Sequence, residues 1–450
     1  MRDLTQGSVL RHLLGMAAFI GFGLLVQTLY VLIDLYFVAH LGEHAVAGVA
    51  AAGSAMFAVM AATQLIGVGA LSLISQAVGR KDQAEGQSVF EQSVLMAALA
   101  GLLTLLLGYS LGGQCVSALA ADQLASANAQ TYLFAFLPSL AMLFPSGAIA
   151  AALRATGVVA APMMVQSLTL GLNILLAPIL IVGWGTGYPL GVAGAGLASS
   201  LASVMGLILL AALFNRMQAY LRLPAAGLTP RWRIWRRIAS LGLPAFGEFL
   251  LMFVMLGVVY WSIRSFGAEA QAGFGIGSRL TQAMFLPVMA IAFAASPIAG
   301  QNYGAGQMHR VRATFGYTAA IGSFIMLGLT LVCQIGPMVL VRPFTGEQPV
   351  AAAASSYLGI VSWNFVSVGL VLACSGMFQA LGNTFPSLLS SASRLFTFVV
   401  PAVWLSYQPD ASLNDFWHLS VLSAILQAAL SLLLLRTELR RKLGSNAVAS

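Results

Sequence analysis

The feature that most constrains this 450-residue chain is a series of about twelve long apolar stretches. They lie at roughly 11–38, 46–71, 88–111, 128–152, 160–183, 190–214, 239–264, 271–297, 313–341, 352–378, 386–407 and 414–436. Most exceed the ~20 residues that cross a bilayer as a helix, and they lack the alternation of a transmembrane strand. Only 8% of the residues are charged, too few to cover a water-exposed surface. We therefore predict an all-α integral membrane protein with twelve transmembrane helices.

The second half of the chain repeats the first at a constant spacing. Matched pairs 225 positions apart are Gly42 and Gly267, Ala45 and Ala270, Ala47 and Ala272, Gly48 and Gly273, Ala58 and Ala283, Ala70 and Ala295, Gln76 and Gln301, Gly79 and Gly304, Tyr132 and Tyr357, and Gly157 and Gly382. Six spans per repeat return the chain to its starting side, so both repeats have the same orientation. We expect two pseudo-symmetric six-helix lobes, residues 1–214 and 239–450, joined by a basic cytoplasmic linker at 215–238. Such proteins place their site near the repeat interface, which makes transport the leading hypothesis.

The basic residues predict how the chain is oriented in the membrane. Of its 21 Lys and Arg residues, all but four fall on one side of the predicted spans. Arg264 and Arg342 lie on the other side, and Arg279 and Arg394 lie within spans. This bias places both termini in the cytoplasm. It also points to anionic lipid headgroups rather than nucleic acid as the partner of the positive charge. The run from Arg231 to Arg237, with Trp232 and Trp235, predicts a short amphipathic helix on the inner surface.

Asp34 is the sharpest single candidate for a functional residue. It follows an apolar run from Gly21 to Ile33, where a carboxylate is costly unless it is paired, hydrated or protonated. Its counterpart in the second repeat is Val259, so the acid is not a shared scaffold feature. Tyr30 precedes it by one helical turn, so its hydroxyl could bond the carboxylate. The alternatives are that Asp34 is hydrated at the outer end of its span and that Tyr30 is an ordinary interfacial or core residue.

Two further polar residues interrupt apolar spans. Asn173 precedes Pro178 by five residues, so its amide could coordinate an ion or meet Asp34, or could compensate for the backbone that the proline disturbs. Glu248 follows Pro244 by four residues and could be a second protonatable group, or a hydrated acid near a helix start.

The remaining candidates belong to the second lobe. The two intramembrane cations, Arg279 and Arg394, could pair with Glu248 or bond free carbonyls, which would make their role structural. The flexible thioethers of four methionines suit a wall that accepts many hydrophobic ligands, although ordinary packing is the alternative. These are Met252, Met255, Met284 and Met289.

Several chemistries are missing from the sequence. It contains no Walker A pattern, no G-x-S-x-G nucleophile motif and no His pair with metal-ligand spacing. The three cysteines, Cys115, Cys333 and Cys374, have no paired spacing. We therefore expect no enzyme, no cofactor, no metal site and no disulfide.

Short motifs along nearly the whole chain resemble those of the multidrug and toxic compound extrusion (MATE) family. The first span ends in Ile33-Asp34-Leu-Tyr-Phe-Val-Ala-His-Leu-Gly42, similar to V-D-T-x-x-x-G-x-L-G of that family. The other motifs are Arg154-Ala-Thr-Gly157 with Pro162, Gly191-Val-Ala-Gly194-Ala195 with Ala198-Ser199, Pro297-Ile-Ala-Gly-Gln301-Asn-Tyr-Gly304 with Arg310, and Gln379-Ala-Leu-Gly382 with Pro386. Their order and spacing together make the resemblance specific.

The resemblance implies a two-lobed exporter with a central cleft, which expels cationic or amphipathic small molecules in exchange for H⁺ or Na⁺. It assigns cation coupling to Asp34, Tyr30, Asn173 and Ser199. Related proteins often carry N-x-x-x-D-P in the fifth span, but here Ala177 replaces that second acid. The tenth span, 362–380, also lacks the acid of the Na⁺-coupled branch. Both departures favour the DinF-like branch and H⁺, with Na⁺ as the alternative ion.

Together these features predict a multi-pass exporter of a bacterial plasma (inner) membrane. We expect it to act as a monomer on small lipophilic or cationic substrates within the lipid bilayer. The alternative within transport is a flippase of a lipid or lipid-linked saccharide from the wider superfamily. Such flippases often have more spans and a strongly cationic cavity, and this sequence predicts neither.

Overall fold

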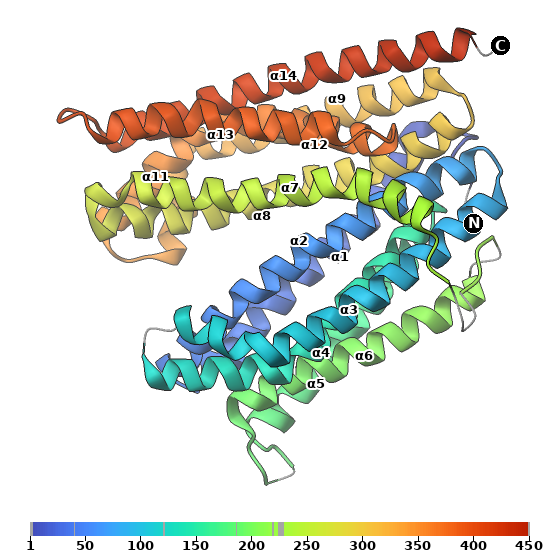
Figure 1. The fold of residues 1–450 in the computed structure, drawn as a ribbon. Coiled ribbons are helices and arrows are strands. Elements are labelled where there is room, and N and C mark those ends of the chain that lie inside the picture. The colour runs from blue at the N-terminus through green and yellow to red at the C-terminus, as the bar shows by residue number, and fades with distance from the viewer. Residues whose placement is uncertain are drawn as a thin grey trace. The chain divides into compact units, whose positions relative to one another are not determined.

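The computed structural model describes residues 3–39, 41–119, 122–185, 187–217, 220–223 and 229–448. Side chains are described for these residues except at positions 31, 34, 35, 51, 54, 55, 119, 217 and 443–448. In this part of the chain every regular element is a helix (Figure 1).

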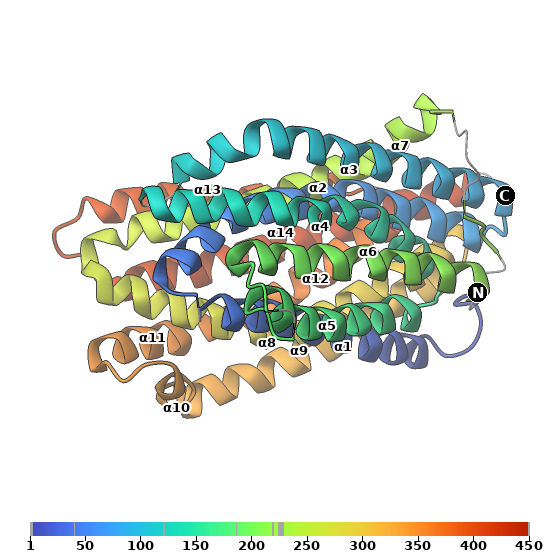
Figure 2. The ribbon, with the colours of Figure 1, turned by 90° about the horizontal axis from the view of Figure 1, so that it is seen from below.

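Six long helices form the first lobe. They are α1 (Val9–Ala39), α2 (Glu43–Gly79), α3 (Gln83–Leu119), α4 (Gln123–Ala155), α5 (Ala160–Ile181) and α6 (Gly191–Met217). Helices α5 and α6 run side by side in both views (Figures 1 and 2). The lobe contains apolar clusters around Phe90, Phe214 and Ile238, around Tyr132, Leu133 and Leu140, and around Ile66, Ala97 and Phe144.

The second lobe repeats this series of long helices, with short helical elements between some of them. Its elements are α7 (Trp232–Ser262), η1 (Arg264–Phe266), α8 (Gly267–Gly304), α9 (Met308–Ile335), α10 (Pro337–Val341), η2 (Arg342–Phe344), α11 (Gln348–Val361), η3 (Ser362–Asn364), α12 (Phe365–Ala380), α13 (Phe385–Ser406) and α14 (Leu413–Val448). Aromatic side chains pack closely in its core, where Phe274 stacks on Trp417 and Tyr357 meets the same indole edge-on.

The predicted twelve spans are confirmed. Eleven segments of the described chain are long and apolar enough to cross a membrane, and one of them, Trp232–Gly304, contains both α7 and α8. The 225-residue repeat also holds in the turns: φ is 101° at Gly42 and 90° at Gly267, and 78° at Gly157 and 71° at Gly382. Glycine is favoured at all four positions because positive φ is strained for residues with a Cβ.

The tenth span differs from its counterpart α4. Helix α4 is continuous through Pro138 and Pro145, whereas the tenth span divides into α11, η3 and α12. Side chains of α9 hold the break open: the Thr330 hydroxyl donates to the Ser362 carbonyl at 2.9 Å, and the Gln334 amide donates to the Gly359 carbonyl. These bonds occupy backbone carbonyls that an uninterrupted helix would use itself.

The compact units of the structure exchange the starts of their first helices. One unit comprises Met1–Asp3 and Phe22–Gly242, and the other comprises Leu4–Gly21 and Leu243–Ser450. The ranges expected from the sequence, 1–214, 215–238 and 239–450, do not contain this exchange. Within the first unit α7 lies so close to α2 that a Cβ at Gly242 would overlap the Leu65 carbonyl. A helix shared in this way could not be inferred from span boundaries alone.

The basic run in the inter-lobe segment is not a separate amphipathic helix. Arg233, Arg236 and Arg237 lie in the first turns of α7. This helix runs without a break from Trp232 to Ser262 and includes Pro244. The indole of Trp235 donates to Gln92 of α3 at 2.7 Å. Polar contacts with α3 therefore fix this end of α7.

Candidate functional site

Three of the predicted coupling residues form one hydrogen-bonded group in the first lobe. The Asn173 amide nitrogen on α5 donates to the Ser199 hydroxyl on α6 at 3.1 Å and lies 3.4 Å from the Tyr30 hydroxyl on α1. Asn173 and Ser199 are completely buried, and Tyr30 is partly buried. Buried polar side chains are costly unless they bond one another, so this group is a defined feature of the apolar interior.

The hydrogen bonds of Asn173 help to decide whether its amide compensates for the backbone that Pro178 disturbs. Its amide joins three helices, and both of these hydrogen bonds go to side chains rather than to the backbone near Pro178. Among the described atoms its carbonyl oxygen, Oδ1, is buried and has no hydrogen-bond partner. The site therefore contains an unused acceptor that suits a proton donor or a cation.

Asp34 lies on α1 one helical turn beyond Tyr30. Its side chain falls outside the part of the structure that is described. The position alone shares a helix face with Tyr30, because residues four apart on an α-helix are neighbours. Ala177, which replaces the family's second acid, is buried one turn beyond Asn173 on α5.

Glu248 on α7 is surrounded by serine hydroxyls. Oε2 accepts from Ser387 on α13 at 2.8 Å and from Ser375 on α12 at 3.3 Å, while Oε1 accepts from Ser391 at 3.4 Å. The Ser387 and Ser375 hydroxyls also bond each other at 2.9 Å. The cage satisfies a carboxylate by neutral donors, so no counter-ion is needed to keep it in place.

These serines were not among the predicted site residues, although their spacing in the sequence could have indicated them. Ser387 and Ser391 are four residues apart in the predicted span 386–407, and such spacing puts two hydroxyls on one helix face. Together with Glu248 they could have been identified as one group.

Neither intramembrane arginine meets Glu248 in the described structure. Arg279 is exposed on α8. Arg394 lies on α13, where its Nε atom is buried without a hydrogen-bond partner among the described atoms and its charge is close enough to interact with Tyr357. An ion pair between Glu248 and an arginine was one expectation. The structure instead shows hydrogen bonds from three serine hydroxyls to Glu248.

The four methionines do not share one environment. Met255 packs against the aromatic core of the second lobe, and Met284 packs beside Cys333, with 3.7 Å between the two sulfur atoms. Met252 is exposed, and Met289 is partly buried. Met255 and Met284 therefore make packing contacts, and a methionine wall that accepts substrate stays a prediction.

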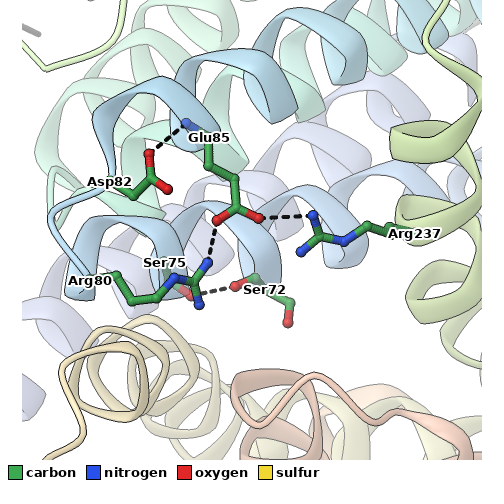
Figure 3. A network of polar contacts seen from close by, with 6 residues as sticks. All are labelled: Ser72, Ser75, Arg80, Asp82, Glu85 and Arg237. Atoms are coloured by element: carbon green, nitrogen blue, oxygen red, sulfur yellow. Dashed lines mark hydrogen bonds and ion pairs between the residues drawn. The ribbon is translucent and has the colours of Figure 1, made fainter.

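A separate ionic group lies at the turn between α2 and α3 (Figure 3). The Glu85 carboxylate accepts from Arg80 and from Arg237 of α7, the latter at 2.8 Å, and the Asp82 carboxylate caps the start of α3. In the second lobe the residue equivalent to Glu85 is Arg310, which donates to the Leu4 and Gly7 carbonyls. The first group fixes the start of α7, and the second fixes the segment that precedes α1. Both roles are structural.

Comparison with known proteins agrees with this architecture. The sequence profile of the MatE family matches residues 20–179 and 244–405. A probable multidrug resistance protein of Bacillus subtilis, YpnP, is 28% identical over 84% of this chain and 86% of its own length. The multidrug export protein MepA of Staphylococcus aureus is 25% identical over 93% of this chain and 92% of its own length. A transporter of the MOP superfamily from Pyrococcus furiosus shares the fold, with a TM-score of 0.90, 23% identity and coverage of 98% of each chain.

Proposed function

This chain belongs to the MATE family, and on that premise we propose that it exports cationic or amphipathic small molecules in exchange for protons. As a member of that family it is a multi-pass membrane transporter and not an enzyme. The names of its relatives, a multidrug resistance protein and a multidrug export protein, support drugs or toxins as the cargo.

The observation that carries the proposal is the buried Tyr30–Asn173–Ser199 group. A transporter needs a place where ion binding changes the stability of one conformation. The Asn173 amide supplies such a place: its carbonyl oxygen has no partner among the described atoms, and its nitrogen bonds Tyr30, one helical turn before Asp34 on α1. A protonated Asp34 carboxyl would donate to this oxygen, whereas an ionised one would only accept.

Proton uptake then biases the transport cycle. In our proposal substrate binds while the cleft opens inward, and Asp34 takes up a proton from the outer side. The neutral carboxyl gains hydrogen bonds within the Asn173 group and favours the conformation that releases substrate. A few kcal/mol of such bias moves a two-state equilibrium by two to three orders of magnitude, since ~1.4 kcal/mol is tenfold.

The remaining assignments are part of the same proposal. We place the protein in a bacterial plasma membrane as a monomer with both termini in the cytoplasm, on the positive-inside bias and the bacterial relatives. Because an amide oxygen also ligates Na⁺, the choice of H⁺ rests on the missing acids at Ala177 and in 362–380.

The test is uptake of a fluorescent lipophilic cation into inverted vesicles under a pH gradient and, separately, under a Na⁺ gradient. We expect wild type to respond to the pH gradient alone and Asp34→Asn to insert normally but transport at background rate. Asp122→Asn is the matched control, because it removes an acid outside the membrane spans and Asn can still cap α4. It should transport like wild type.

Three outcomes would contradict the proposal. Wild-type export by Asp34→Asn would remove Asp34 as the coupling residue. Transport driven by the Na⁺ gradient alone would replace the proton by Na⁺. A lack of export under both gradients would overturn drug export and make lipid flipping the next assay.

A further inference from the structure

A second candidate site lies within the second lobe, between α9 and α14, two helices that Figure 1 labels. A pocket of about 340 Å³ opens there between three arginines and an apolar floor. Its lining residues are Arg312, Phe315, Leu432, Leu435, Arg436, Leu439 and Arg440. None of the lining residues is acidic, so the pocket combines concentrated positive charge with apolar surface.

The equivalent place in the first lobe is filled by the chain itself. There Leu221, in the described segment 220–223, is completely buried in the cluster that contains Phe90 and Phe214. Two glutamines of α3 hold its backbone: Gln83 donates to the Tyr220 carbonyl at 2.7 Å, and Gln87 exchanges two 2.8 Å bonds with Arg222. At this position, then, the fold accommodates an apolar group with polar backbone beside it.

Each of these features differs in the second lobe. The 225-residue spacing replaces Gln83 and Gln87 by Met308 and Arg312, which cannot bond a backbone segment in the same way. Helix α6 ends at Met217, whereas α14 continues past the equivalent position to Val448. Because α14 continues as a helix, the described part of the chain has no segment over the pocket equivalent to residues 220–223 of the first lobe.

The three arginines are available to an external anion. Arg312, Arg436 and Arg440 are exposed and form no ion pair within the described residues, while the nearby Glu438 pairs with Arg441 at 2.9 Å. Arg310, two residues before Arg312, is instead fully engaged with Asn302 and the carbonyls of Leu4 and Gly7. The positive charge of the pocket is therefore not used by the fold.

We propose that this pocket binds an anionic phospholipid of the inner leaflet, with its phosphate at the three arginines and part of an acyl chain on Phe315 and the leucines. The positive-inside bias puts these ends of α9 and α14 at the cytoplasmic leaflet, where anionic lipids are enriched. A free phosphate would satisfy the arginines but leave the apolar floor uncovered. Lipid covers both, as Leu221 and its backbone do in the first lobe.

The experiment compares lipid retention by native mass spectrometry after full-length protein is incubated with phosphatidylglycerol or phosphatidylcholine. The test variant combines Arg312→Gln, Arg436→Gln and Arg440→Gln. The matched control, with Arg216→Gln, Arg233→Gln and Arg236→Gln, loses the same charge on the same predicted side but outside the pocket. A second variant, Leu439→Trp, fills the pocket and keeps every arginine.

We expect wild type and the control to retain phosphatidylglycerol in preference to phosphatidylcholine. Each arginine near an anionic lipid strengthens binding about fivefold, so the test variant should bind roughly a hundredfold more weakly. Leu439→Trp should also lose most of the bound lipid.

Equal losses in the test and control variants would reduce the effect to general surface charge and overturn the proposal. Wild-type retention by Leu439→Trp would exclude the pocket as the binding place. Displacement of the lipid by millimolar inorganic phosphate, with no preference for acyl chains, would make the site an anion site. The proposal does not depend on the exported cargo, so none of these results bears on drug export.

Discussion

In the first lobe, α5 and α6 carry the buried pair Asn173 and Ser199, whereas the equivalent positions of α13 and α14 carry Phe398 and Ala424. The reverse holds nearer the starts of α1 and α7. There the second lobe has Glu248 within its serine cage, and the first lobe has Gly23. A Cβ at Gly23 would overlap the Met163 sulfur, so a larger residue there requires the Met163 side chain to move.

This difference shows that the two halves of a duplicated fold carry their buried polar groups at different positions. The helices of both lobes follow the same plan, but Gly23 lies beside Met163 where the second lobe has Glu248. Conversely, Phe398 lies where the first lobe has Asn173. The comparison predicts that the first lobe carries ion coupling and that the second serves another purpose. Four substitutions test this difference between the lobes.

Leu221→Ala should cause the largest change in stability. It removes a completely buried side chain from the first lobe and leaves a cavity beside Phe90, so unfolding should become easier by about 2–5 kcal/mol. Leu439→Ala, at the wall of the open pocket in the second lobe, should cost less. Denaturant unfolding in detergent micelles would measure both, and equal losses would mean that the two places are packed alike.

Asn173→Leu should lower the initial export rate at least tenfold while the protein still inserts. The change removes the amide that joins Tyr30 and Ser199, and an unmatched buried polar group costs about 1–3 kcal/mol. Phe398→Leu alters the equivalent position of the second lobe and should retain export. If both variants fail alike in the vesicle assay, coupling is not confined to the first lobe.

Glu248→Gln should lower export only several-fold, about 1 kcal/mol, because serine hydroxyls can donate to or accept from the new amide. Its rate should therefore lie between those of wild type and Asp34→Asn in the same vesicles. A variant as inactive as Asp34→Asn would show that both lobes carry a coupling acid.

Lys81→Gly should stabilise the protein slightly. Lys81 has a φ of 61° in the turn between α2 and α3, and its counterpart in the second lobe is Gly306 with a φ of 74°. Relieving this left-handed conformation should gain about 1 kcal/mol, measured as a higher midpoint of thermal unfolding. Lys81→Ala keeps the Cβ and should give no gain; a gain of equal size would assign the effect to the lost charge.

Much of the fold was predictable because lipid permits few solutions. Apolar length alone indicated the helices, and the spacing from Gly42 to Gly267 indicated the duplication. The break between α11 and α12 was not predictable, since it depends on bonds from Thr330 and Gln334 of a neighbouring helix. The exchange of helix starts between the units was also missed, because span lengths do not report which helices pack together.

The candidate site was partly predictable for the same kind of reason. Asn173 and Tyr30 were noticeable as polar groups in apolar spans, but Ser199 was indicated only by a family motif, and serine is too common in membrane helices to be noticed alone. Glu248 was identified, while its partners were not. An arginine was one expected partner on grounds of charge, yet packing of α7 against α12 and α13 put serines there.

The residue pattern alone is enough to show that this chain lies in a membrane, crosses it about twelve times and is built from two related halves, because burial of backbone polar groups in lipid demands long apolar helices. Tertiary structure alone decided which side chains meet. Asn173 joins Ser199, Glu248 joins three serines, and the chain covers Gln87 but leaves Arg312 open. Such contacts depend on distances of a few ångströms between residues far apart in the chain, which no local pattern specifies.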